Sequence, residues 1–245
     1  MTTLIRNEFL KLRTTRSLWL LLVAAQVVIV AGVSGAMISG LSVSDPATAP
    51  RLFGHVGLVS LFTLVLGIMA LGGEYRHKTI SDTFLATPRR GRVVLAKLIA
   101  YAVAGLSFGL VVAATCLAAA AIWFAAKGGS LDLSSSEVWR TIGGGIAWNV
   151  AFAAVGVGLG ALVRNQTAAI AAALVWIALV EGILRQIIGG LGRWLPFASG
   201  QALGRLTGIS SSGALSQWVG GLVLAGYVAL FAILAASFTI RRDVT

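Results

Sequence analysis

Six apolar segments dominate the sequence, and each is longer than the roughly 20 residues that a helix needs to cross the hydrocarbon core of a bilayer. These segments are Ser17–Gly40, Leu52–Gly73, Val93–Ala126, Thr141–Val163, Ala168–Ile188 and Trp218–Ile240. Charged residues make up only 11% of the chain, whereas a soluble domain has roughly 25%. The sequence therefore predicts an all-α, polytopic membrane protein with six transmembrane helices in one domain, residues 1–245. The third segment is long enough that its helix should tilt or protrude.

Lysine and arginine residues are divided unequally between the two sides of the membrane. If the N-terminus is cytoplasmic, 13 of the 19 lie on the cytoplasmic side and 6 on the other. This excess predicts that both termini are cytoplasmic. In a soluble protein the net charge of +11 would suggest nucleic acid, but here the basic residues lie in short segments between apolar runs, which favours an anionic lipid surface over nucleic acid. The bias toward Ala, Gly, Val and Arg indicates a high-GC bacterium, so we expect a bacterial plasma membrane.

Two segments outside the spans have a distinct character. Residues 1–16 contain an amphipathic stretch that predicts a helix lying in the membrane interface. A plain basic flank that only sets the topology is the alternative. Residues 189–216 are rich in Gly and Ser and too polar to span, so we expect an extracytoplasmic loop or short helices resting on the outer surface. The apolar face of the first stretch is formed by Leu4, Ile5, Phe9 and Leu12.

The most informative connection is the first cytoplasmic loop, residues 74–92. Its first part, Glu74–Ala86, has no Gly or Pro and can be helical, and Thr87 before Pro88 ends that helix. Ile80, Phe84 and Leu85 are expected on one side of it. A short charged helix with an apolar stripe, held between two spans, is suited to docking into a groove on another protein.

The same loop resembles a known family. Residues 73–80 read Gly-Glu-Tyr-Arg-His-x-Thr-Ile, residues 85–92 read Leu-Ala-Thr-Pro-x-Arg-x-Arg, and Lys-Leu follows at 97–98. Together with Glu8-Phe9-x-Lys11-Leu12-Arg13-Thr14-x-Arg16-Ser17 and Leu195-Pro196-Phe197, this pattern resembles the permeases of ABC-2 type ATP-binding-cassette exporters.

The resemblance implies a machine of several subunits. Residues 74–86 would be a coupling helix that contacts a separately encoded ATPase, and the permease would pair with a second copy, identical or paralogous, and with two ATPase copies. Glu74 would lie at the membrane edge beside a basic group. For Arg89, Arg90 and Arg92 the alternative is that they only satisfy the positive-inside rule. The residues expected to contact or support the ATPase joint are Glu74, Arg76, His77, Lys78, Thr79, Asp82, Thr83, Leu85 and Arg89.

The same resemblance implies that the second and fifth spans line the translocation path, which makes Phe62, Leu66 and Trp176 candidates for it. Glu181 and Arg185 are an unusual pair, since ionisable residues in a span usually face a cavity or a partner. They share a helical face in the favourable order, acid first. They are candidates for an outer gate; the alternatives are a structural pair or Glu181 bound to another helix.

Several chemistries are not supported by motifs. The sequence has no G-x-x-x-x-G-K-[ST] phosphate loop, so the chain itself is not an ATPase, and ATP and Mg²⁺ would bind to the partner subunit. It has no metal-binding motif, and no cofactor is expected in this chain. Gly105–Gly109 fits G-x-S-x-G around Ser107 but lacks a strand-turn-helix context and a suitable base, so an intramembrane enzyme is disfavoured.

The main alternative is a secondary transporter driven by an ion gradient. Such a transporter needs intramembrane carboxylates, and only Glu181 is available. It also often has an inverted repeat, which the sequence does not show. The transported substrate stays undetermined, because lipid, antibiotic, peptide and polymer exporters share this layout.

Overall fold

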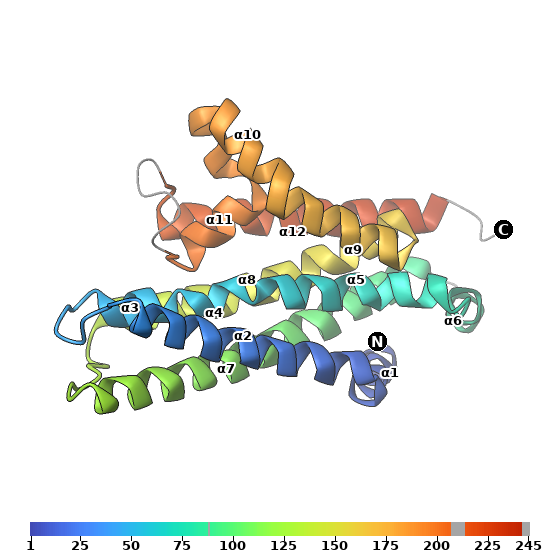
Figure 1. Ribbon diagram of the computed structural model, residues 1–245. Coiled ribbons are helices and arrows are strands. Elements are labelled where there is room, and N and C mark those ends of the chain that lie inside the picture. Colours follow the sequence, from blue (N-terminus) through green and yellow to red (C-terminus); the bar gives the residue numbers. More distant parts are fainter. Residues whose placement is uncertain (88, 207–213, 242–245) are drawn as a thin grey trace.

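The computed structural model describes residues 1–87, 89–206 and 214–241, and all its regular elements in that part of the chain are helices (Figure 1). Their bounds are α1 Thr2–Thr14, α2 Arg16–Ile38, α3 Thr48–Phe53, α4 His55–Leu58, α5 Ser60–Arg76, α6 Ile80–Ala86, α7 Arg90–Ala126, α8 Ser136–Val163, α9 Gln166–Val175, the π-helix η1 Trp176–Val180, α10 Glu181–Ile187, the 3₁₀ helix η2 Gly189–Trp194, α11 Pro196–Leu203 and α12 Gln217–Arg241.

Six helical segments are long and apolar enough to cross a membrane, which confirms the predicted all-α, six-span architecture. Four of them are single helices close to their predicted bounds, namely α2, α7, α8 and α12. The second span, Thr48–Arg76, is built from α3, α4 and α5, and the fifth, Gln166–Ile187, from α9, η1 and α10. The third, α7, has 37 residues and is therefore about 55 Å long, well beyond a hydrocarbon core of roughly 30 Å.

Helix α8 lies at the centre of the bundle and packs against α5, α7 and α12. Close approach of α5 and α8 depends on glycine, since a Cβ on Gly67 would collide with Ala153 O and a Cβ on Gly156 with Leu64 O. Gly160 is equally tight against Ile68 O. Gly156 and Gly160 thus form a GxxxG pair that serves packing within the chain.

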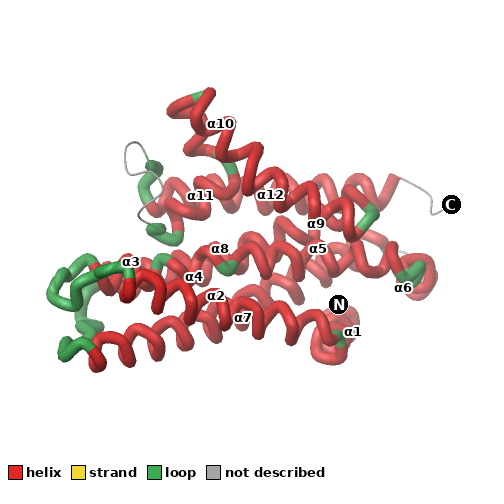
Figure 2. Tube along the Cα trace, viewed as in Figure 1, coloured by secondary structure: helices red, strands yellow, loops and turns green. Residues whose placement is uncertain are grey.

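Different short helices lie at the two ends of the bundle (Figure 2). One end, called here the α6 end, contains α1, α6 and the described end of α12. The opposite end, called the α11 end, contains α3, η2 and α11. The short helices predicted within residues 189–216 are present as η2 and α11. Their position on the outer membrane surface stays a prediction, and α11 also packs into the bundle, since Ala198, Ser199 and Gly200 are buried. Gly200 faces the fully buried Trp148 of α8 so closely that a Cβ would collide with its indole ring.

The structure also corrects the prediction of one helix from Glu74 to Ala86. Helix α5 continues to Arg76, the chain breaks at residues 77–79, and α6 begins at Ile80. Lys78 has φ +57°, and the amides of Lys78 and Thr79 donate to Tyr75 O (3.3 Å) and Glu74 O (3.0 Å). This is a Schellman ending with a lysine in the left-handed position, so the absence of Gly from the segment did not prevent the break.

Candidate functional site

Four charged side chains from three helices form a buried ion cluster at the α6 end, and Lys97 of α7 is its centre. Lys97 is fully buried, and its Nζ donates to Glu8 Oε2 (2.9 Å), Glu74 Oε1 (2.7 Å) and the carbonyl of Ala70 (3.0 Å). All three of its ammonium hydrogens thus have acceptors. Lys97 thereby connects α1, through Glu8, to the last turns of α5.

Lys11 closes the cluster on its exposed side. Its Nζ donates to Glu74 Oε1 (2.7 Å) and Glu8 Oε1 (3.1 Å), and its side chain is half exposed. Burial alone would lower the pKa of Lys11, but the hydrogen bonds and charges of Glu74 and Glu8 raise it above its ordinary value. Lys11 therefore stays protonated at neutral pH, and two carboxylates are balanced by two ammonium groups.

The sequence analysis identified Glu74 but missed Glu8, Lys11 and Lys97 as its partners. Two signals were present. Glu8 lies four residues from both Leu4 and Leu12, inside the apolar face of the first helix, and an acid in such a face needs a buried partner. Lys97 follows Val93-Val94-Leu95-Ala96 within an apolar run, where a lysine is costly unless it is paired.

The connection between α5 and α7 presents a second surface, called here the α6 surface and formed by the side chains that the structure describes between residues 76 and 89. Arg76, His77, Lys78, Thr79 and Arg89 are exposed on it.

Among the side chains of α6 that the structure describes, Ile80 attaches the helix to the bundle and Leu85 does not. Ile80 is buried in the same apolar cluster as Leu12 and Val93, whereas Leu85 is 81% exposed. Ile80 and Leu85 therefore do not share a face, and the predicted apolar stripe is wrong in that respect, because a spacing of five residues in one α-helix places two side chains about 140° apart. Thr83 is half-buried and its hydroxyl donates to Thr79 O (3.1 Å). The side chains of Asp82 and Phe84 lie outside the described residues, as does Pro88.

Of the residues predicted for a translocation path, Phe62 and Leu66 lie one turn apart on α5, and Trp176 lies on the fifth span. Phe62 packs with the cluster around α2 and α7, and Leu66 with the cluster around Leu12 and Tyr101. Trp176, 41% exposed, lines a separate apolar pocket with Leu64. Their role in transport stays a prediction.

Glu181 binds another helix, which was one of the alternatives left by the sequence. It is 1% exposed, and its carboxylate accepts the backbone N–H groups of Phe197 (3.1 Å) and Ala198 (2.6 Å) at the start of α11. Glu181 directly follows the π-helix η1. Arg185 donates to Gln201 Oε1 (2.8 Å). Both residues therefore fasten the fifth span to α11, and a role in gating stays a prediction.

Ser107 has no enzymatic setting. It lies inside the continuous helix α7, and its hydroxyl donates to Val103 O (3.0 Å) of the same helix. The strand-turn-helix context that gives G-x-S-x-G its meaning is missing at this position.

Comparison with known proteins gives one match. A sequence profile described as an ABC-2 family transporter protein matches residues 4–180. This range includes the ion cluster, the α6 surface and the first five spans as far as Val180. A comparison with curated proteins found no match.

Proposed function

The chain belongs to the ABC-2 family of transporter proteins, and on that premise we propose that it is the permease subunit of an exporter driven by a separate ATPase. Family membership and six apolar helices make it a multi-pass membrane permease of an ABC transporter, and imply association with an ABC ATPase. The export direction, the assembly and the orientation below are part of the proposal.

The observation that carries the proposal is the exposed, one-sided mounting of α6. Ile80 anchors this helix to the bundle while Leu85 points away from it, 81% exposed. Large exposed apolar side chains next to exposed basic ones are typical of a docking surface rather than a solvated loop. We assign the α6 surface to ATPase contact, with Arg76, His77, Lys78, Thr79, Asp82, Thr83, Leu85 and Arg89 as its members.

The ion cluster supplies a route from that surface into the membrane. Glu74 lies four residues before Lys78 on the helix that leads into the α6 surface, and it binds Lys97 of α7 and Lys11 of α1. Buried charge pairs resist separation, since an unpaired charge in a low-dielectric interior is costly. Displacement of α6 would therefore move α1, α5 and α7 together rather than bend the loop alone.

In this mechanism the α6 end is cytoplasmic and the membrane is a bacterial plasma membrane. ATP and Mg²⁺ bind to two ATPase copies, which close on ATP and push the α6 surfaces of two permease copies. The second and fifth spans of each permease, α3–α5 and α9–α10, then switch the path between them from inward to outward opening. The basic residues at the α6 end support this orientation.

Co-purification with the ATPase encoded beside this chain tests the proposal. Replacing residues 76–85 by a Gly/Ser linker should abolish ATPase retention and transport. A Gly/Ser replacement of residues 131–135, in the loop at the opposite end, is the control and should leave both intact. If ATPase binding and transport survive the first replacement, the coupling assignment is wrong.

An ion-gradient transporter is less well supported by the contacts. It would need a carboxylate that is available to a coupling ion, and Glu181 already accepts two backbone N–H groups. Transport that stops when the proton gradient is collapsed, but continues when ATP is depleted, would favour that alternative.

A further inference from the structure

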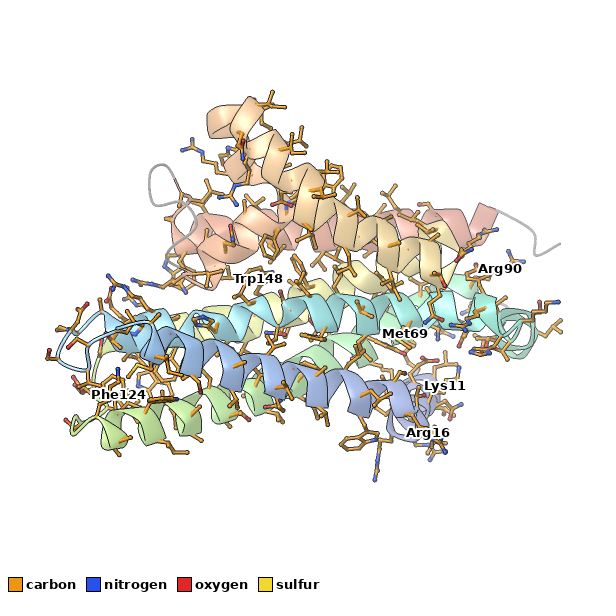
Figure 3. All side chains as sticks on the ribbon, in the orientation of Figure 1. Lys11, Arg16, Met69, Arg90, Phe124 and Trp148 are labelled. Carbon is orange, nitrogen blue, oxygen red and sulfur yellow. The ribbon has the colours of Figure 1, made fainter. Side chains whose placement is uncertain are left out.

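A cavity of about 600 Å³ lies beside the ion cluster at the α6 end. It is bounded by α1, the start of α2, α5 and α7, and it reaches the break after α5. Figure 3 labels Lys11 and Met69, two of its lining residues, at this end of the bundle. Its volume lies within the range of about 300–1,000 Å³ that is typical of ligand sites.

The cavity changes from apolar to charged along α5. Leu66, Met69 and Ala70 line one part, and Glu74, Arg76 and His77 line the part nearer the α6 surface. At 1.5 Å per residue, the distance from Leu66 to Glu74 is about 12 Å along the helix. Arg76 and His77 are exposed, so a guanidinium group and an imidazole ring lie at its rim. Such a gradient matches an amphiphile lying with its head at the membrane edge.

Glu74 has an unused acceptor in this setting. Both lysines donate to its Oε1, and its Oε2 is buried with no hydrogen-bond partner among the described residues. Glu74 as a whole is only 8% exposed. A buried carboxylate oxygen without a donor is unfavourable, and such a group calls for an explanation.

We propose that the cavity binds a phospholipid with a primary ammonium headgroup. Its ammonium donates to Glu74 Oε2, its phosphate faces Arg76 and His77, and an acyl chain lies against Leu66 and Met69. A donor is required because a carboxylate oxygen only accepts, and an ammonium makes a charge-assisted bond that is stronger than that of a neutral hydroxyl. A trimethylammonium headgroup has no N–H and cannot make this bond, and a glycerol headgroup offers only neutral hydroxyl donors.

Lipid retention by the full chain tests the site. The chain is reconstituted in nanodiscs that contain equal amounts of phosphatidylethanolamine, phosphatidylcholine and phosphatidylglycerol with identical acyl chains. It is then extracted, and the lipids that stay bound are counted by native mass spectrometry. We expect phosphatidylethanolamine to be retained roughly ten-fold over either of the others, as one charge-assisted hydrogen bond allows.

Two variants test which groups cause the preference for phosphatidylethanolamine, and a third is the control. Glu74→Gln removes the charge and should bring the three lipids close to equal retention. Met69→Trp fills the cavity without touching the ion cluster and should abolish retention of all three. Glu137→Gln removes a carboxylate that pairs with Arg205 outside the cavity, and should leave the preference unchanged.

Equal retention of phosphatidylethanolamine and phosphatidylcholine would overturn the proposal, since water would then be the donor to Glu74. Equal retention of phosphatidylethanolamine and phosphatidylglycerol would also overturn it, since the ammonium group would then give no advantage over a neutral hydroxyl or over the phosphate alone. Neither measurement needs the ATPase, so a failure here is separate from a failure of the exporter assignment.

Discussion

Lys97 is the residue on which the α6 end of the molecule depends. It is fully buried, yet its ammonium group has three acceptors on two other helices. Glu8 and Glu74 are almost as deeply buried, at 5% and 8% exposure. Each carboxylate is therefore tolerated because a lysine faces it, and the loss of one partner leaves the others uncompensated.

Substitution of Lys97 by Met should destabilise the protein strongly. The change leaves Glu8 and Glu74 with only the half-exposed Lys11, and breaking a buried pair in this way costs about 3–5 kcal/mol. Arg92→Met, on an exposed position of the same helix, should change stability by about 0.5 kcal/mol or less. Thermal unfolding in detergent measures both.

The double variant Glu8→Gln/Lys97→Met adds a further check on the same pair. It removes one charge of each sign, so it should be less destabilised than the sum of its two single variants. Strict additivity of the two changes would contradict the direct contact between Glu8 and Lys97.

Of this ion cluster, the sequence pointed to Glu74 but not to Glu8 or Lys97. Glu74 was identified because it lies in a motif, whereas Glu8 and Lys97 are 89 residues apart. Their spacing says nothing about contact; only packing of α1 against α7 brings them together. The clue available from sequence was chemical: each charge interrupts an apolar pattern and therefore requires a partner.

At the level of elements, the contact between α5 and α8 is set by small residues. Gly67, Gly156 and Gly160 let the two backbones approach, and a side chain at any of them would meet backbone atoms. In contrast, a Cβ on Gly143, also in α8, meets nothing within 4 Å. Helix α8 thus contains one glycine, Gly156, where a side chain would collide with backbone, and another, Gly143, where it would not.

Gly156→Val should separate α5 from α8 and lower the apparent melting temperature markedly, because its side chain would have to displace Leu64 O and the neighbouring backbone. Gly143→Ala is the matched control and should be neutral or slightly stabilising, because Ala favours the helix over Gly by roughly 1 kcal/mol. Equal effects of the two changes would show that the close contact is not needed.

Boundaries of elements were predictable only where chemistry marks them. Asn165 caps α9 by accepting the amide of Ala168 (3.1 Å), and Ser135 caps α8 by accepting the amide of Glu137 (3.3 Å); both residue types are common at such positions. The end of α5 at Lys78 has no such marker, since lysine rarely adopts a positive φ. The π-helix before Glu181 has no marker in the sequence either.

For the whole molecule, six spans followed from hydropathy because lipid permits few other solutions for a chain of this composition. The packing of α11 against Trp148 could not be predicted from the sequence, because the segment that forms α11 is polar enough for a surface loop. The exporter assignment likewise needed more than hydropathy: it depends on the loop after the second span and on the family that shares it.

The central claim is that the ATPase contacts α6. A photo-crosslinking amino acid placed at Leu85 in the native membrane should form a covalent adduct with the ATPase, because this side chain is 81% exposed beside the docking surface. The same probe at Ile122, 68% exposed on the membrane-spanning helix α7, should give no such adduct. An ATPase adduct at Ile122 and none at Leu85 would contradict the assignment of α6 as the joint between permease and ATPase.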